Sequence, residues 1–144
     1  MSALYDSSAL VALYVEAHPR HQIMVDTHLD LFNDVSVFYV CAHSLAELYS
    51  TITKGVSYLN FSPVMAESLI EGAIVPLFKI VELDKVDYLA VINFLKKHNL
   101  RGGIIYDALI ARASANVEAE NLVTFNIKDF KRVRALTTAS ILEP

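Results

Sequence analysis

The strongest constraint on the fold is the alternation of short apolar runs with longer segments of helical periodicity. The apolar runs cover residues 3–5, 35–41, 77–83, 122–125 and 139–142. They are too short for helices and are bounded by polar residues, which is typical of strands buried in a parallel sheet. Strands that alternate with helices favour right-handed crossovers and helices on both faces of the sheet. The sequence therefore predicts a three-layer α/β/α fold with a central parallel sheet of four to five strands.

The segments between these runs carry helix signals. Ser7 and Ser8 can cap the first helix, Gly55 can stop the third, and Asp84 can cap a later one. Helices are expected over residues 7–14, 19–33, 44–55, 63–74, 84–99 and 104–116, with a helical turn at 127–133. We expect the helix from residue 63 to end before Pro76, because proline interrupts a helix.

Helical phase assigns faces to two of these segments. In the segment 44–55, the apolar stripe consists of Leu45, Leu48, Tyr49 and Ile52. In the segment 84–99, the apolar face consists of Val86, Leu89, Ala90 and Phe94. Both stripes are expected to face the core.

The length and composition fit one compact domain covering residues 1–144. Hydrophobic residues make up 54% of the chain and charged residues 19%, against a usual apolar share of about 45–50%. This excess is expected from a sheet covered on both faces and from a subunit interface. No apolar stretch approaches the roughly 18–20 residues that span a bilayer.

Two observations favour a cytoplasmic location. Residues 1–6 lack the basic and apolar regions of a signal peptide. Cys41 is the single cysteine, so no internal disulfide can form, and a reducing compartment is expected. We therefore expect a cytoplasmic protein that does not insert into membranes.

The charge balance argues against a broad nucleic-acid-binding surface. The net charge is −4 and the isoelectric point about 5.7, whereas phosphate contacts need basic side chains. Lys128, Lys131, Arg132 and Arg134 nevertheless gather near the C-terminus. That cluster is either a phosphate-binding patch or a solvated helical face. Arg101, beside two glycines, is a second candidate for phosphate binding.

Acidic side chains that follow strands are the first candidates for chemistry, because sites in such sheets lie beyond the carboxyl ends of the strands. Asp6 follows the first apolar run, and Asn126 and Asp129 follow the fourth. Asp107 opens a helix after a glycine pair. Each also has a structural interpretation as a capping or turn residue. Glu47 lies opposite the apolar stripe of its helix, and taken alone it is a solvated glutamate.

The order and spacing of four segments select among these interpretations. The segments are Ala-Leu-Tyr-Asp-Ser-Ser-Ala-Leu at 3–10, Ser-Leu-Ala-Glu-Leu-Tyr-Ser at 44–50, Gly-Gly-Ile-Ile-Tyr-Asp-Ala-Leu-Ile-Ala at 102–111 and Leu-Val-Thr-Phe-Asn-Ile-Lys-Asp-Phe at 122–130. Together they span nearly the whole chain, and they resemble the PIN-domain ribonucleases, especially the VapC-like toxins of toxin–antitoxin pairs. The resemblance implies a PIN-like fold, a homodimer, cleavage of RNA with Mg²⁺ or Mn²⁺, and restraint by a cognate antitoxin protein.

The resemblance also implies roles for particular residues. Asp6, Glu47 and Asp107 match the family's three constant acids and are expected to bind the metal. Many members have a fourth acid where this chain has Asn126, so Asp129 either supplies that charge or the site works with three carboxylates. Ser7 and Thr124 are expected to be supporting hydroxyls that orient a carboxylate or a water molecule.

Several other functions were weighed against this one. A zinc site is disfavoured because Cys41-x-His43 and His18-x-x-His21 lack paired spacing. A serine nucleophile would need a G-x-S-x-G elbow, which the chain lacks. Aspartyl phosphotransfer at Asp6 is disfavoured because it would suit a second acid at position 8, where this chain has Ser8. The main alternative from another class is a binding module that keeps the fold but lacks competent metal chemistry.

Overall fold

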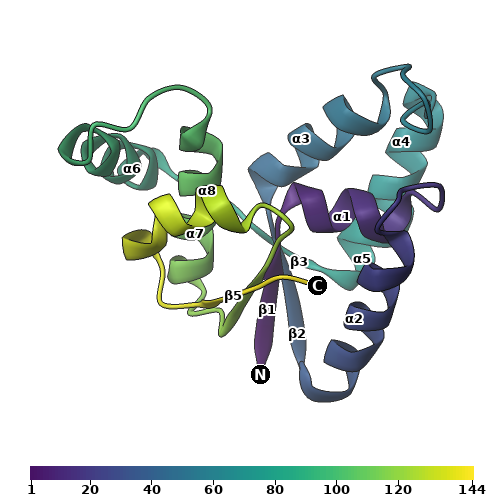
Figure 1. Cartoon of the computed structure of the whole chain (residues 1–144), viewed down its shortest axis with the longest axis horizontal. Coiled ribbons are helices and arrows are strands. Elements are labelled where there is room, and N and C mark those ends of the chain that lie inside the picture. The colour runs from purple at the N-terminus through teal and green to yellow at the C-terminus, as the bar shows by residue number, and fades with distance from the viewer.

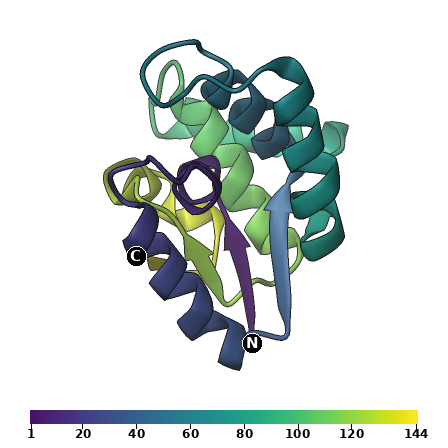
Figure 2. The ribbon, with the colours of Figure 1, turned by 90° about the vertical axis from the view of Figure 1, so that its right-hand side faces the viewer.

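A computed structural model describes residues 1–144, and its centre is a five-stranded parallel sheet. The strands are β1 (Ser2–Tyr5), β2 (Val37–Cys41), β3 (Lys79–Val81), β4 (Asn121–Val123) and β5 (Ser140–Leu142), in the order β3-β2-β1-β4-β5. β1 is central and runs up the middle of the view between β2 and β4 (Figure 2). The predicted parallel sheet is confirmed, with five strands.

Helices cover both faces of this sheet. They are α1 (Ser7–Tyr14), α2 (His21–Asp34), α3 (Ala42–Ile52), α4 (Pro63–Leu69), α5 (Val75–Leu77), α6 (Lys85–Lys97), α7 (Ile104–Asn116) and α8 (Ile127–Arg132). The helices α1 to α5 lie on one side of β1 and β2, and α6 to α8 lie on the other (Figure 1). No helix is both long and apolar enough to cross a lipid bilayer.

The alternation of side chains along β1 explains why the core has two halves. Ala3 and Tyr5 point to the face covered by α1 to α4, whereas Leu4 points to the opposite face under α7. Both halves are built from fully buried apolar residues, and β1 contributes to each. A strand buried on both faces must be apolar throughout, which is why residues 3–5 read as an unbroken run.

The segment from Pro63 to Leu77 differs from the prediction. It continues past Pro76 instead of ending before it, because a π-helical turn over Ile70–Ile74 joins α4 to α5. Proline has no N–H for the usual helical bond and its ring crowds the preceding turn. The wider π turn directly before α5 gives this proline a place near the helix start. Local propensity signals do not reveal such a turn.

The buried face of α6 also differs from the prediction. Val86 and Leu89, expected in the core, are 63% and 56% exposed, while Asp87, Val91 and Leu95 are buried. The Asp87 carboxylate accepts hydrogen bonds from Arg112 Nε at 2.8 Å and Asn116 Nδ2 at 3.0 Å, both on α7. These bonds turn the Asp87 side of α6 toward α7. Val86 and Leu89 therefore face outward, while Phe94 from the same predicted face packs against the core.

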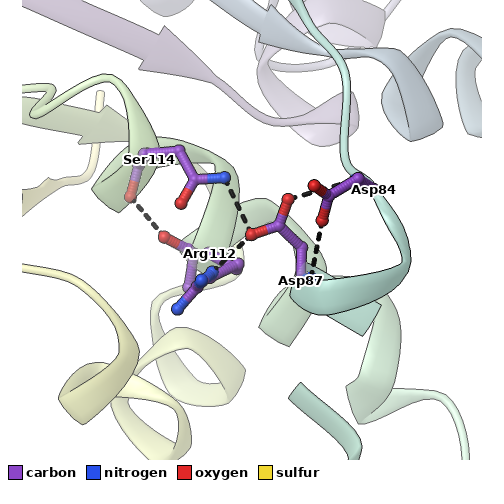
Figure 3. A network of polar contacts seen from close by, with 6 residues as sticks. Asp84, Asp87, Arg112 and Ser114 are labelled. Carbon is purple, nitrogen blue, oxygen red and sulfur yellow. Dashed lines mark hydrogen bonds and ion pairs between the residues drawn. The ribbon is translucent and has the colours of Figure 1, made fainter. Parts of the chain in front are cut away.

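Asp87 also completes the cap of α6. Its Oδ2 accepts from the Asp84 backbone N–H, and Asp84 Oδ1 accepts from the Asp87 N–H (Figure 3). Burial raises the pKa of Asp87, but the hydrogen bonds from Asn116 and Arg112 outweigh burial and lower it to about 2. The predicted cap at Asp84 is confirmed. Its partner Asp87 is what fixes the orientation of the helix.

Candidate active site

The candidate site lies where β2, β1 and β4 end side by side. Asp6 directly follows β1, Thr124 directly follows β4, and α3 begins directly after β2. The carboxyl ends of β1 and β2 point toward the space between the start of α1 and the helices α3 and α7 (Figure 1). This is the edge at which ligands bind in open parallel sheets.

Asp6 is held by a set of hydrogen bonds and is only 3% exposed. Its Oδ1 accepts from the Ser8 hydroxyl at 2.7 Å and from the Ala9 backbone N–H at 2.9 Å. Its Oδ2 accepts from the Thr124 hydroxyl at 2.5 Å. Burial raises the pKa of Asp6, and these hydrogen bonds oppose that rise. The carboxylate is therefore fixed in place before any ligand arrives.

The supporting hydroxyls correct one part of the prediction. Thr124 contacts the Asp6 carboxylate as expected, but Ser7 makes no side-chain hydrogen bond there; Ser8 does. Asp6 itself caps α1, a role that the sequence had assigned to Ser7 and Ser8. Ser8 lies two residues after the cap, in the first turn of α1, where its hydroxyl also accepts from the Phe125 N–H at 3.0 Å. Ser8 therefore links α1 to the segment after β4.

Glu47 is not the solvated glutamate that its helical phase suggests. Its side chain is 28% exposed, and its Oε1 atom is buried without a hydrogen-bond partner. His43 Nε2 lies 3.9 Å from this atom, but burial lowers the pKa of His43 and so disfavours its charged form. Burial and the negative charge of Asp6 raise the pKa of Glu47 to about 7. Glu47 thus lies close enough to Asp6 for the two carboxylates to repel each other.

Asp107 lies in the first turn of α7 and completes the trio. Burial raises its pKa to about 7, together with the charges of Asp6, Asp129 and Glu47. Asn126 Nδ2 donates to Asp107 Oδ2 at 3.3 Å, which opposes the rise. Asn126, which stands where many family members have an acid, therefore donates to a carboxylate in this arrangement.

Asp129 is the outermost acid of the group. It lies in the first turn of α8, its side chain is 38% exposed, and it pairs with Arg132 at 3.6 Å. Its negative charge nevertheless helps to raise the pKa of Asp107. The basic cluster after β4 is only partly free, because Arg134 donates to the Ala139 carbonyl at 2.6 Å. Lys128 and Lys131 are exposed, and neither forms an ion pair.

The acidic group fits a divalent cation by its chemistry. An ionised carboxylate offers about four lone-pair sites, and Asp6 uses three of them in hydrogen bonds. Glu47 Oε1 has no donor at all. All ligands would be oxygen atoms, which hard cations such as Mg²⁺ prefer. No three His, Cys, Asp or Glu side chains are gathered closely enough to hold an ion as they stand. The acids would therefore have to draw together as an ion binds.

Sequence reasoning missed an aromatic pair beside Glu47. The His43 and Tyr106 rings stack with centroids 5.0 Å apart and an angle of 11° between their planes. Tyr106 directly precedes Asp107, and His43 lies one helical turn before Glu47. Both Asp107 and Glu47 therefore have an aromatic ring nearby on the same helix. The spacing alone gives no signal, because the two residues come from different helices and meet only where α3 packs against α7.

Comparison with known proteins identifies the family. Residues 3–136 match the PIN domain family. Ribonuclease VapC27 of Mycobacterium tuberculosis is 30% identical over 118 residues, which cover 80% of this chain and 78% of that protein. Asp6, Glu47 and Asp107 all lie within the range that matches the PIN domain family.

Solved structures agree at the level of the fold. VapBC2 from Rickettsia felis, bound to a DNA fragment from its promoter, superposes with a TM-score of 0.69 at 22% identity, covering 100% of this chain and 99% of that one. VapC20 of Mycobacterium tuberculosis, a toxin that cleaves the sarcin–ricin loop, superposes with a TM-score of 0.68 at 14% identity, covering 96% and 98%. The chain therefore belongs to the PIN-domain family and is a relative of the VapC ribonucleases.

Proposed function

We propose that this protein is a metal-dependent endoribonuclease that acts as the toxin of a toxin–antitoxin pair. The observation that carries the proposal is the convergence of Asp6, Glu47 and Asp107 at one edge of the sheet, where their charges raise one another's pKa. Repelling carboxylates are costly for a fold unless a cation uses them. The similarity to a VapC ribonuclease supports RNA as the substrate.

We assign Asp6 and Asp107 as direct ligands of Mg²⁺ or Mn²⁺ and Glu47 as a ligand or as the group that orients the attacking water. A bound divalent ion supplies charge neutralisation at the phosphate and lowers the pKa of a water molecule. Thr124 and Ser8 fix the Asp6 carboxylate, while Asn126 holds Asp107. Asp129 contributes negative charge from outside this group.

Purified protein is expected to cut RNA when Mn²⁺ or Mg²⁺ is present and to leave it intact in EDTA. The same ions should raise the melting temperature, because they bind the folded state and relieve repulsion among the acids. Gel analysis of total RNA and a thermal shift assay measure the two effects. Cleavage of equal rate in EDTA would contradict the metal dependence.

The second candidate function is a PIN-like binding module that is catalytically weak or inactive. The observation in its favour is Asn126, a neutral amide close to Asp107 where many family members have an acid. This alternative predicts that Mn²⁺ neither raises the melting temperature nor causes cleavage. A melting temperature that rises without cleavage would favour a module that binds metal but has lost its chemistry.

The partners that we infer are a cognate antitoxin and a second copy of the chain. Both need apolar surface, and the sequence suggests the apolar helices before Gly55 and between Pro63 and Pro76 as docking and dimer surfaces. The apolar residues of α3 mostly pack inward, and only Tyr49 among the predicted stripe is exposed. α4 exposes Val64 and Met65, and α6 exposes Val86 and Leu89, which the sequence had assigned to the core. The surfaces of α4 and α6 are therefore the better supported sites for partners.

Leu89→Glu is expected to convert a dimer into a monomer without unfolding the chain. Leu89 is 56% exposed and lies beside Val86 and Ile92 on the outward face of α6. A glutamate there costs little in a monomer, but a charge buried in an apolar interface is strongly unfavourable. Light scattering coupled to gel filtration measures the mass. Lys96→Glu, in the last turn of the same helix, is the control, and an unchanged dimer in Leu89→Glu would exclude this face.

A further inference from the structure

A cleft opens beside the acidic group, next to the start of α1. It has a volume of about 400 Å³ and is lined on its floor by Ser7 and Ser8 and on its walls by Tyr58, Leu59 and Phe125. Ser8 is shared with the site, since its hydroxyl donates to Asp6. A ligand in the cleft would therefore lie one side chain away from the Asp6 carboxylate. The volume falls in the range of about 300–1,000 Å³ that is usual for small-molecule sites.

The walls combine aromatic rings with a cation. The Arg20 guanidinium lies over the Phe125 ring, 4.9 Å from its centroid. Across the cleft, His18 meets Tyr58 edge to face, with ring centroids 5.7 Å apart. Arg20 forms no ion pair with any carboxylate, so its charge is free for an anionic ligand. The cleft thus joins π surfaces to an available positive charge in a chain of net charge −4.

The loop that carries Tyr58 is well fixed. Gly55 N–H and Val56 N–H both donate to the Leu59 carbonyl, at 2.9 and 3.2 Å, and Phe61 N–H donates to the Ile52 carbonyl at 2.8 Å. Ser57 has a φ of 54°, in the left-handed region that side chains rarely adopt. The turn is held in this conformation, and it places Tyr58 and Leu59 at the wall of the cleft. A wall that is already ordered loses less conformational entropy when a ligand binds.

We propose that this cleft is a nucleotide subsite for single-stranded RNA, in which one base packs against Tyr58 and Phe125 while Arg20 binds the adjoining phosphate. This inference rests on the proposed function, because the neighbouring nucleotide would present its phosphodiester to the acids. Aromatic side chains stack on any base, and arginine binds phosphate through a planar fork of donors. Ser7 and Ser8 add hydroxyl groups on the floor.

The combination favours RNA over a protein side chain as the occupant. An apolar side chain from a partner would use the aromatic walls but would leave Arg20 without an anion. A nucleotide uses both and also reaches the acids through Ser8. The subsite would also explain how an acidic protein binds a polyanion: Arg20 binds one phosphate and the aromatic walls hold a base, so that a broad basic surface is not needed.

Two variants test the subsite by direct binding. Arg20→Gln and Tyr58→Leu are each expected to weaken the binding of a fluorescein-labelled single-stranded RNA, in EDTA, by roughly 5- to 100-fold. Lys97→Gln, an exposed charge loss at the end of α6 on the opposite face of the sheet, should bind as the parent does. RNA containing 4-thiouridine should cross-link to Tyr58 or Phe125. Arg20 is exposed, so its replacement tests the proposal even if Tyr58→Leu unfolds.

The outcomes separate this proposal from the nuclease activity. In cleavage assays both variants should raise KM and leave kcat nearly unchanged, as expected for a contact made equally in ground and transition states. If the parent binds RNA through these residues but never cuts it, the subsite stands and the nuclease function fails. If both variants bind RNA as tightly as the parent, the subsite is excluded, whatever the cleavage rate. Variants that lose only the binding of an apolar partner peptide would also exclude it.

Discussion

Replacing Asp6 by asparagine is expected to slow metal-dependent RNA cleavage by about 10³-fold or more while the protein stays folded. Asp6 is the most deeply buried acid of the group, and hydrogen bonds from Ser8, Ala9 and Thr124 fix it at the end of the central strand. A neutral amide is a much weaker ligand for a hard cation. Metal-based stabilisation of charge contributes several kcal/mol, and each 1.36 kcal/mol corresponds to a factor of ten in rate.

The fold should survive because asparagine reproduces the structural role of Asp6. Its side-chain oxygen can still accept from the Ala9 N–H and cap α1, where asparagine is as favourable as aspartate. Removing a buried charge whose pKa is raised also relieves repulsion with Glu47. Circular dichroism and the melting temperature without metal should therefore match or exceed those of the parent.

Asp84→Asn supplies a matched control for this experiment. Asp84 caps α6 as Asp6 caps α1, so the same atom is exchanged at an equivalent position away from the acidic group. This variant should cut RNA at the parental rate. A parental rate in Asp6→Asn as well would remove Asp6 from the metal site, and equal losses in both variants would point to capping instead of catalysis.

The position of Asp6 could be predicted because the sequence states it directly. A buried strand in a parallel sheet must be apolar, so the first polar residue after residues 3–5 marks its carboxyl end. The same logic located Asn126 after the fourth strand, whereas the role of Thr124 came from the resemblance alone. The order of the four motif segments along the chain then indicated the family to which these positions belong. The fold and Asp6 were therefore accessible from local patterns and from resemblance.

The surroundings of Glu47 could not be predicted, since they depend on packing between elements distant in sequence. Helical phase places Glu47 opposite Leu45, Leu48 and Ile52, which suggests solvent. In the structure this other face of α3 meets α7 and the end of β1, so the carboxylate is half buried near Asp6. A helix packed between two layers can bury both faces, and periodicity reports only the apolar one.

The orientation of α6 was predicted wrongly for a related reason. The apolar stripe of Val86 and Leu89 predicts a core face, but a single buried carboxylate decides the rotation of the helix. Asp87 is held by Arg112 and Asn116 from α7, and leaving those donors without a partner would cost more than exposing a few apolar side chains. Such long-range polar pairs carry no local signal. The apolar side chains that this orientation exposes, Val86 and Leu89, belong to the surface that we propose for partners.

In metal-free protein, Glu47→Gln is expected to stabilise the fold by about 1 to 2 kcal/mol at pH 8 and to have almost no effect near pH 4.5. Burial and the charge of Asp6 raise the pKa of Glu47 from 4.5 to about 7. As pH rises through this window, the unfolded chain ionises before the folded one, so stability is lost from pH 4.5 to about 7. Glutamine cannot ionise and avoids that loss.

Comparing the variant with the parent isolates this contribution. Burial lowers the pKa values of His18, His28 and His43, so these histidines add stability as pH rises over the same range. The effects of His18 and His28 cancel in the difference between the two proteins, whereas His43, 3.9 Å from Glu47, is coupled to the substitution. Urea unfolding in EDTA at several pH values measures it, with Glu67→Gln on the exposed side of α4 as the control.

Adding Mn²⁺ tests whether this cost serves the metal site. The ion should raise the stability of the parent at pH 8 and do much less for Glu47→Gln, because one ligand and its repulsion are gone. The variant should therefore be more stable than the parent without metal, and the parent should gain more stability than the variant when Mn²⁺ is added. A difference between them that is the same at pH 4.5 and pH 8 would show that Glu47 is solvated. A fold that keeps three mutually repelling acids at one strand edge is less stable when empty, and that penalty is what an incoming cation relieves.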